Sequence, residues 1–301
     1  MNAIEIKNLT KTYKTGTKAL RGVDLTVAEG DFFALLGSNG AGKTTIIGIL
    51  TGLVNKSGGE VKVFNHSIDG DFEEARKLIG VVPQEFNFNM FEQVQDIVVN
   101  QAGYFGIERP IAIKDSEAIL KRVGLWEKRK AMSRTLSGGM KRRLMIARGL
   151  IHHPKMLILD EPTAGVDVEL RHGMWDYLRE INKQGTSILL TTHYLEEVEQ
   201  MCRNCAIIKE GQIVKFDSVR NLLMMIPQDT YRVSVKEMLA LDAVKSFKPV
   251  KIDDHTLDIE IQQRDELNKF IMLMVQNGFV ITDLHPKGNR LEKLFLEIVQ
   301  K

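Results

Sequence analysis

The fold of this chain is decided by the stretch Gly37-Ser38-Asn39-Gly40-Ala41-Gly42-Lys43-Thr44. It follows the apolar run Phe32–Leu36, which is typical of a buried strand, and it precedes residues 46–50, whose apolar side chains have helical spacing. Glycines allow the backbone N–H groups of such a loop to turn inward, and the N-terminus of the helix behind it favours negative charge. The order strand, loop, helix therefore predicts a P-loop that binds two or three phosphate groups.

The residues of this loop have expected parts in holding a nucleotide. Lys43 would reach the β and γ phosphates, and the Thr44 hydroxyl would bind Mg²⁺, a hard cation that prefers oxygen ligands. We assign to nucleotide binding the residues Gly37, Ser38, Asn39, Gly40, Ala41, Gly42, Lys43, Thr44 and Thr45.

Two carboxylates follow a second apolar run. Residues 156–159 predict a buried strand that delivers Asp160 and Glu161 at its carboxyl end, where ligands bind in open α/β sheets. We expect Asp160 to hold Mg²⁺ through water and Glu161 to polarise the attacking water. On its own this pair could equally be a solvated acidic turn, and the P-loop is what favours the catalytic interpretation.

Strand and helix patterns alternate over the first two thirds of the chain. Branched apolar runs at residues 79–82 and 187–190 join the two described above as expected parallel strands, with helical periodicity between them. Residues 86–135 have no comparable strand and carry helical stripes instead. We therefore expect an α/β P-loop core over residues 1–220 that contains a helical insertion at about residues 86–135.

The pattern changes after Pro227, where a small C-terminal domain is expected over residues 228–301. Apolar and polar residues alternate first and helical spacing follows, so the domain should be of the α+β kind. The expected elements are a strand over 256–261, a helix over 267–274 that Gly278 ends, a strand over 279–281, and a last helix that begins at Asn289 with Glu292 as its capping partner.

Composition excludes several classes of protein. Lys plus Arg (41) against Asp plus Glu (39) gives 41 − 39 = +2, too balanced for binding nucleic acid by bulk charge, and no nucleic-acid partner is expected. The two cysteines are too few for a disulfide framework. No window approaches the roughly 18 consecutive apolar residues of a membrane span. We expect a cytoplasmic chain, with any membrane part supplied by another polypeptide.

A further motif separates one family from the other P-loop proteins. Leu136-Ser137-Gly138-Gly139-Met140, followed by a basic run at 141–143 and a helix, resembles the signature sequence of ABC transporter ATPases. The P-loop and Gln84 precede this motif, and Asp160 with Glu161, residues 164–167 and His193 come after it, which is the family's order. The resemblance covers residues 1 to about 220, and residues 82–89 and 191–197 look most like the YadG-type ATPases of the ABC-2 exporter group.

The resemblance implies roles for three more residues. Tyr13 would stack on adenine, Gln84 would contact Mg²⁺ and the attacking water, and His193 would contact the γ-phosphate. Taken alone, they could be a strand-end tyrosine, a solvated loop glutamine and a strand-end histidine. The implied catalytic set is Glu161, His193 and Gln84, and the implied metal set is Thr44, Gln84 and Asp160.

Ser137, Gly138 and Gly139 start a second helix that can bind phosphate. The resemblance implies a head-to-tail homodimer in which Ser137 of one subunit closes over ATP held by Lys43 of the other. Two departures from the family pattern concern that interface. Met140 replaces the usual glutamine, and Ala164-Gly165-Val166-Asp167 differs from the usual loop before its aspartate.

Three further groups of residues lie outside the motifs described above. Phe86, Phe88, Met90 and Phe91 could line a groove that grips a helix of a membrane subunit, or could pack inside the insertion. His152 and His153 match no motif and are expected on the surface. Residues 253–255 are expected to form a hairpin turn rather than a metal site.

The leading hypothesis is an ATP-hydrolysing, Mg²⁺-dependent subunit that drives a separate membrane permease of the ABC-2 exporter type. It would lie on the cytoplasmic face of the inner membrane. One alternative is a soluble ABC-family ATPase that acts on nucleic acid or the ribosome. The other is a nucleotide-gated binding module that does not hydrolyse ATP, against which the presence of Glu161 and His193 argues.

Overall fold

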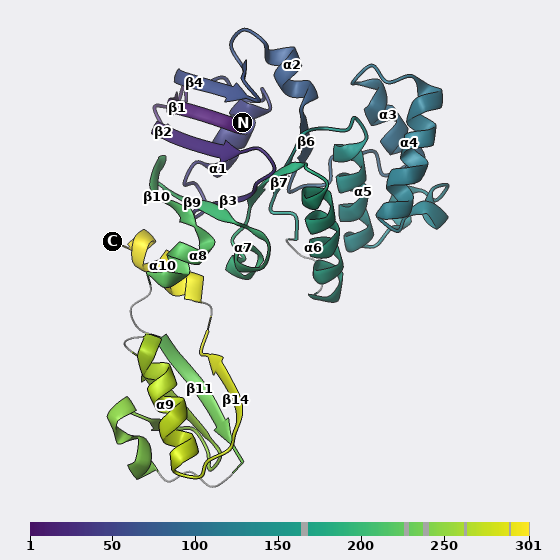
Figure 1. Cartoon of the computed structure of the whole chain (residues 1–301). Helices are drawn as coiled ribbons and strands as arrows, with labels where there is room; N and C mark the ends of the chain where they lie inside the picture. Colours follow the sequence, from purple (N-terminus) through teal and green to yellow (C-terminus); the bar gives the residue numbers. More distant parts are fainter. Residues whose placement is uncertain (164–167, 226–228, 237–240, 262–263, 289, 301) are drawn as a thin grey trace. The chain divides into compact units, whose positions relative to one another are not determined.

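The computed structural model describes residues 1–163, 168–225, 229–236, 241–261, 264–288 and 290–300 (Figure 1). They form two compact units, Met1–Val219 and Arg220–Lys301. Each unit has an apolar core of its own.

A six-stranded sheet organises the first unit. Its order is β10-β9-β3-β8-β7-β6, and neighbouring strands are parallel except that β10 is antiparallel to β9. The strands are β3 (Phe32–Leu36), β6 (Ile79–Val82), β7 (Met156–Asp160), β8 (Ser187–Thr191), β9 (Asn204–Lys209) and β10 (Gln212–Ser218), and the helices that follow them include α1 (Lys43–Leu50), α6 (Val168–Lys183) and α7 (Leu195–Met201). The four strands expected from apolar runs, β3, β6, β7 and β8, are confirmed. Because these strands are parallel, their carboxyl ends share one edge of the sheet.

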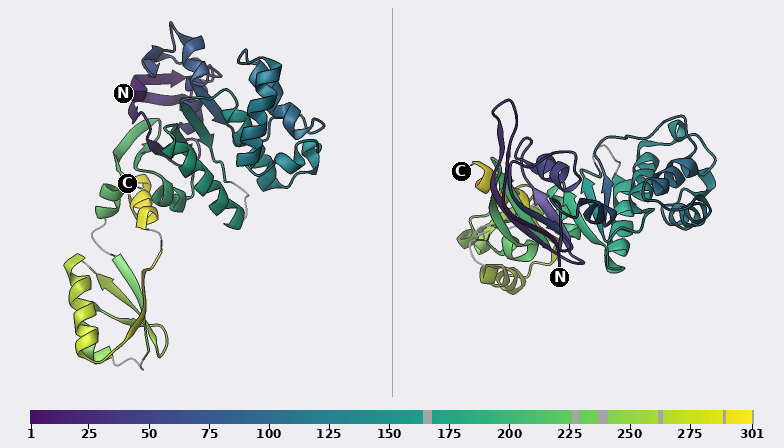
Figure 2. Two further views of the ribbon diagram at one scale, coloured as in Figure 1. Left: turned by 45° about the vertical axis from the view of Figure 1, so that its right-hand side comes forward. Right: turned by 90° about the horizontal axis from the view of Figure 1, so that it is seen from above.

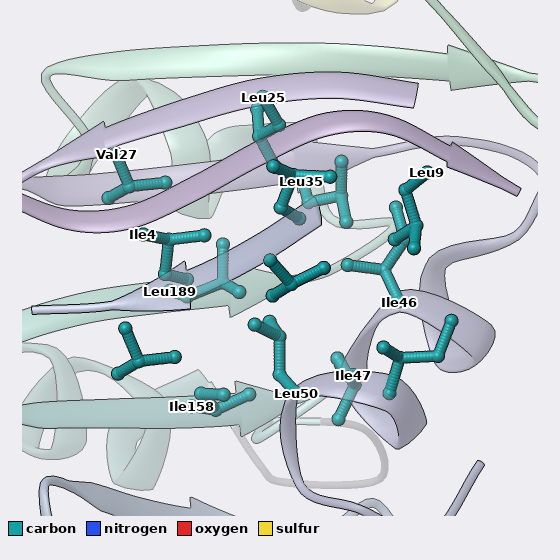
Figure 3. Packing of buried hydrophobic residues seen from close by; sticks show 14 of the residues in the cluster. Ile4, Leu9, Leu25, Val27, Leu35, Ile46, Ile47, Leu50, Ile158 and Leu189 are labelled. Atoms are coloured by element: carbon teal, nitrogen blue, oxygen red, sulfur yellow. The ribbon is translucent and has the colours of Figure 1, made fainter. Parts of the chain in front are cut away.

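The sequence patterns do not predict the second sheet of this unit, which is antiparallel and has the order β2-β1-β4-β5. Its strands are β1 (Asn2–Thr12), β2 (Lys18–Ala28), β4 (Gly58–Val63) and β5 (His66–Ser67), and the short helix α2 (Phe72–Lys77) comes after them. Ile4 and Leu25 of this sheet share one apolar cluster with Ile46 of α1 and with Leu35 and Ile158 of the parallel sheet (Figure 3). Helix α1 is therefore held in a core to which both sheets contribute.

Residues 94–150 form a helical arm at the β6 edge of the parallel sheet (Figures 1 and 2). The arm contains α3 (Val94–Gly103), α4 (Arg109–Arg122), the 3₁₀ turns η1 (Trp126–Lys128) and η2 (Ser133–Thr135), and α5 (Gly138–Leu150). Its core is separate from that of the sheets and includes Val98, Leu120 and Leu144, which are completely buried. Helix α5 also packs against β6, so it connects the arm to the sheet.

The second unit contains a four-stranded antiparallel sheet of order β12-β13-β11-β14. Helix α8 (Val219–Met224) begins at the last residue of the first unit and continues into the second, where it is followed by β11 (Asp229–Val235), η3 (Leu241–Phe247), β12 (Val250–Lys251), β13 (Thr256–Ile261), α9 (Arg264–Gln276), β14 (Ile281–Pro286) and α10 (Arg290–Gln300). Leu257, Ile259, Phe270 and Met274 are buried in its core, as their spacing predicts.

One boundary expected in this unit is wrong. The strand after α9 begins at Ile281 and not at residue 279. Gly278 has φ 81°, and the N–H of Phe279 donates to the carbonyl of Met274 at 3.0 Å, so Phe279 belongs to the end of the helix. The expected hairpin turn at 253–255 lies between β12 and β13. Asn289, expected as a helix cap, lies outside the described residues.

Candidate functional site

The P-loop lies between β3 and α1, and two of its glycines are required by their surroundings. A Cβ on Gly37 would approach the carbonyl oxygen of Ile208 to 2.6 Å. Gly42 has φ 119°, and a Cβ there would meet Leu20 Cδ2 at 2.8 Å. The loop therefore needs glycine for both backbone conformation and close packing.

Lys43 lies at the start of α1 and is directed back into the loop. Its Nζ donates to the carbonyl oxygens of Gly37 at 2.7 Å and Ser38 at 3.1 Å, and the residue is only 6% exposed. Burial lowers the pKa of Lys43, and the carboxylates of Glu161 and Asp160 oppose that shift. The ammonium group and the two carboxylates therefore share one site, although they are far apart in the sequence.

The remaining loop residues present polar atoms around this cation. Ser38, Asn39, Gly40 and Thr44 are exposed, Thr45 is partly buried, and Ala41 is buried with its N–H donating to the Ser38 carbonyl at 3.1 Å. Exposed N–H groups and hydroxyls at a helix N-terminus are suited to phosphate oxygens.

The carboxyl ends of β7 and β8 are linked to each other. The hydroxyl of Thr191 donates to Oδ1 of Asp160, and the N–H of Glu161 donates to the Thr191 carbonyl at 2.9 Å. Glu161 has a left-handed backbone with φ 46°, a conformation that costs a residue with a Cβ about 1–2 kcal/mol. Such strain, held in place by the surrounding hydrogen bonds, is typical of functional positions.

Gln84, Glu161 and His193 meet at one oxygen atom. Gln84 Nε2 donates to Glu161 Oε2 at 2.9 Å, and His193 Nδ1 lies 3.3 Å from the same oxygen. The Glu161 side chain is 12% exposed and that of His193 is 50% exposed. The three residues come from three separate strand ends, and the fold brings them together where a substrate can reach them.

Tyr13 lies beside the P-loop helix, just after β1. Its hydroxyl is 3.3 Å from Oγ1 of Thr45, and Lys11 Nζ is 4.9 Å from the centroid of its ring. Tyr13 is 37% exposed, so part of the ring is open to a partner. The N-terminal sheet therefore places an aromatic surface next to the phosphate-binding loop.

The signature residues lie elsewhere in the unit. Ser137 caps α5, where its Oγ accepts from the N–H of Met140 at 3.3 Å, and Ser137 and Gly138 are exposed. Helix α5 packs on β6 and on the arm helices α3 and α4, whereas the P-loop follows β3, which is separated from β6 by β7 and β8. Within one chain, this helix N-terminus and the P-loop belong to different parts of the unit. The loop Ala164–Asp167 that departs from the family pattern lies outside the described residues.

Sequence reasoning missed Arg142, which holds the backbone next to Gln84. Its guanidinium donates to the carbonyl oxygens of Pro83 and Gln84, each at 2.8 Å, and lies 5.1 Å from the centroid of the Phe86 ring. Arg142 is 3% exposed, and burial lowers its pKa. A second arginine of α5, Arg148, donates to the carbonyl of Asn87 at 3.2 Å. The only sequence signal was the basic run after the signature motif, which does not identify a partner.

Replacing Arg142 by glutamine should slow the expected ATP hydrolysis about tenfold, because Gln84, which is expected to contact the attacking water, would lose the support of its backbone, and a small misplacement of such a group is costly. The substitution removes the paired donors to two carbonyl groups, which costs about 1–3 kcal/mol for each one left buried and unpaired. The measurement is the steady-state rate with saturating Mg·ATP. Lys141→Gln, at the preceding position of the same helix, is the matched control. Equal rates for both variants would contradict a positioning role for Arg142.

One expectation about the neighbouring residues needs correction, and one open alternative can be described. His152 is half-buried rather than exposed: its ring stacks on Phe105 with centroids 3.6 Å apart, its Nε2 hydrogen-bonds with the carbonyl of Ile79 at 3.0 Å, and burial lowers its pKa to about 4. His153 is exposed, as expected. Phe88 packs against the core of the arm, whereas Phe91 is 70% exposed.

A groove of about 490 Å³ opens beside the segment that carries Gln84. Among the described residues, its lining includes none of Phe86, Phe88, Met90 and Phe91. Its apolar walls come instead from three other parts of the unit and are formed by Leu53, Ile79, Val81, Pro83, Tyr104 and Phe105, with Arg76 and Arg148 as its charged members.

The donor atoms at the P-loop suit magnesium. Thr44, Asp160 and Gln84 offer a hydroxyl, a carboxylate and an amide oxygen, which are the ligands that a hard cation prefers. The amide nitrogen of Gln84 is used on Glu161, which leaves its oxygen as the atom for a cation. Within the described ranges no group of three or more His, Cys, Asp or Glu side chains could hold a metal by itself. Phosphate oxygens and water would have to complete the coordination.

The comparisons with known proteins agree with this architecture. Residues 20–164 match the family model described as ABC transporter. The chain is 34% identical to the Nod factor export ATP-binding protein I of Burkholderia lata, over 89% of this chain and 81% of that protein. It is 29% identical to the linearmycin resistance ATP-binding protein LnrL of Bacillus subtilis, over 98% of this chain and 97% of that protein.

Solved structures show the same fold. A dimeric ATP-binding cassette in a post-hydrolysis state with ADP and Pi aligns with TM-score 0.66 and 27% identity, over 72% of this chain and 99% of that one. The cbiO1 protein of Clostridium perfringens, part of an ABC transporter complex, aligns with TM-score 0.67 and 29% identity, over 75% of this chain and 94% of that one.

The fold and the site define a P-loop ATPase of the ATP-binding cassette type. More specifically, the chain belongs to the family of ABC transporter ATP-binding proteins. It is the ATP-binding, ATP-hydrolysing subunit of a transporter, which confirms the leading hypothesis at that level. Cassettes of this kind dimerise and work with membrane components. No helix in the part of the chain that the structure describes is long and apolar enough to cross a membrane.

Proposed function

We propose that two copies of this chain bind two Mg·ATP molecules between them and drive a separate membrane permease of the ABC-2 exporter type. The chain would lie on the cytoplasmic face of the membrane. The names of the relatives support export, since one concerns Nod factor export and another concerns linearmycin resistance. The near-complete match to LnrL includes the second unit, which supports a shared architecture for the whole subunit.

In this proposal the P-loop, from Gly37 to Thr45, binds the phosphates, and Tyr13 stacks on adenine. Lys43 neutralises the β and γ phosphates, and Mg²⁺ is held by Thr44, by Gln84 and, through water, by Asp160. The metal supplies charge neutralisation on the phosphate oxygens. The position of Lys43 among the loop carbonyls and near both carboxylates supports these roles.

Glu161 is the general base of the proposed reaction. It polarises a water molecule for attack on the γ-phosphate, while His193 contacts that phosphate and Gln84 orients the water. The observation that carries the proposal is the meeting of Gln84, Glu161 and His193 at a single carboxylate oxygen, in the same site as Lys43.

Dimerisation completes the site. Ser137, Gly138 and Gly139 form a helix N-terminus whose first two residues are exposed, and it is separated from the P-loop of its own chain, so it is suited to the γ-phosphate bound by a second copy. ATP then favours the closed dimer, and hydrolysis removes the phosphate that both copies hold.

The permease is proposed to dock in the groove beside Gln84. Leu53 and Tyr104 in its lining are each 84% exposed, and apolar side chains that are exposed together in a groove are typical of a protein-binding site. Asn87 and Arg148 in the groove are hydrogen-bonded to each other, and Arg142 of the same helix holds Gln84. A helix that inserts there would contact the segment that orients the attacking water.

The test of this proposal is affinity purification of the full chain from detergent-solubilised membranes of its native host. We expect a co-purifying protein with several spans of about 20 apolar residues each. Tyr104→Ala should reduce its recovery at least several-fold without slowing ATP hydrolysis by the isolated chain. Ile111→Ala, an exposed apolar position on α4 outside the groove, is the control. Recovery of ribosomes or nucleic acid in place of a membrane protein would contradict the proposal.

A further inference from the structure

Glu197 is a completely buried carboxyl group that the roles above do not use. It lies on α7, four residues after His193, and is 0% exposed. Burying a carboxylate is costly unless hydrogen bonds compensate for the water that it loses. Its contacts therefore indicate what it does.

The carboxyl group joins two segments of the catalytic site. The hydroxyl of Thr163 donates to Oε1 of Glu197, and Thr163 lies two residues after Glu161. The hydroxyl of Thr192, the residue before His193, faces the same carboxyl group. Burial raises the pKa of Glu197, and the hydroxyls of Thr163 and Thr192 oppose that shift, together with the side chain of Trp175 and the charge of Arg171 on α6.

The turn that contains His193 is held by the same residues. The N–H of Tyr194 donates to Thr192 Oγ1 at 2.9 Å, and the N–H of Glu197 donates to the Tyr194 carbonyl at 3.0 Å. Thr163 and Thr192 are each 1% exposed, so water does not compete for their hydroxyls. Buried hydrogen bonds therefore connect Thr163 through Glu197 to the start of α7 and to the turn before it.

We propose that Glu197 is a positioning residue for ATP hydrolysis, which fixes the spacing between Glu161 and His193 by binding Thr163. The inference rests on the roles proposed above for Glu161 and His193. A carboxylate that only stabilised α7 would affect folding and would leave the turnover of correctly folded protein unchanged. A positioning residue instead changes kcat and leaves the binding of Mg·ATP intact.

The test compares Glu197→Gln with Glu196→Gln in the full chain. Glutamine preserves the volume of the side chain but removes its charge and one acceptor oxygen, and Glu196 is an exposed carboxylate in the same turn of α7. We expect kcat of Glu197→Gln to fall about tenfold, with KM for Mg·ATP within about twofold of the parent, and no change for Glu196→Gln. Rates are normalised to nucleotide-binding sites counted by titration, so a misfolded fraction does not contribute. An unchanged kcat for Glu197→Gln would overturn the proposal.

A double-mutant cycle with Thr163→Val tests whether Glu197 acts through Thr163. Valine has the shape of threonine without the hydroxyl, so this variant also serves if Glu197→Gln does not fold, and it should show the same loss of kcat. The double variant should be no slower than the slower single variant. If the losses of kcat in the two single variants multiply in the double variant, Glu197 does not act through Thr163. Full activity of Thr163→Val would also overturn this proposal. If Glu161→Gln abolishes turnover while Glu197→Gln does not, only this inference fails, whereas if both retain turnover the role of Glu161 fails as well.

Discussion

Glu161→Gln should reduce steady-state ATP hydrolysis by about 10²- to 10⁴-fold, the usual contribution of a general base. Glutamine retains the shape of the side chain and can still pair with Gln84 and His193, which meet at the present carboxylate oxygen at 2.9 and 3.3 Å. It cannot accept a proton from water at neutral pH. Binding of Mg·ATP should survive because Lys43 and the P-loop are unchanged.

The same substitution should change the association of the protein. When ATP is bound but not hydrolysed, the closed dimer persists, so the variant should elute as a dimer with Mg·ATP and as a monomer with Mg·ADP. Size-exclusion chromatography with light scattering measures this. Glu29→Gln is the matched control, because Glu29 is an exposed carboxylate at the opposite end of β3. Turnover at the parental rate in Glu161→Gln would show that another group activates the water.

The second large effect is that Lys43→Met should lose nucleotide binding, whereas Ser137→Arg should keep nucleotide binding and lose only dimer formation and hydrolysis. Lys43→Met should weaken Mg·ATP binding by on the order of 100-fold, since a hydrogen bond to a charged group contributes about 1.5–3 kcal/mol. Both hydrolysis and dimer formation should be lost with it. Ser137→Arg leaves the P-loop of its own chain intact, so the monomer should bind Mg·ATP normally.

Ser137→Arg should nevertheless fail to form the ATP-dependent dimer and should lose hydrolysis, because the bulky side chain occupies the place of the γ-phosphate contact. Binding is measured with a fluorescent nucleotide, and association is measured in the Glu161→Gln background. Asn100→Arg, an exposed position on α3 of the same helical arm, tests whether any added arginine has this effect. Loss of nucleotide binding by the Ser137→Arg monomer would contradict a site shared between two copies.

Much of the fold could be predicted from short-range patterns. The strands β3, β6, β7 and β8 are mainly apolar runs, because a parallel strand that is buried on both faces has no face in contact with water. The antiparallel sheet that starts at Asn2 was missed because polar and charged residues interrupt its strands on the exposed face. The strand after Gly278 was placed too early because Phe279 is apolar but belongs to the end of α9.

The candidate site was predicted less completely than the fold. Motifs identify residues within one local segment, such as the P-loop or the pair Asp160 and Glu161. They do not identify residues that act on another segment. Arg142 therefore went unnoticed, although it binds the backbone of Gln84, 58 residues away. The partial burial of His152 was missed for the same reason, since its stacking partner Phe105 is distant in the sequence.

By itself, the sequence determined where the backbone can bind phosphate, because the glycines before Lys43 and the helix that follows are local properties of consecutive residues. It also determined which strands are buried, through their apolar side chains. Only the tertiary structure decided that Gln84 and His193 contact the same carboxylate oxygen of Glu161, and that Thr163 binds Glu197. Hydrogen bonds of this kind depend on distances between strand ends, and those distances exist only after the parallel sheet has aligned the strands.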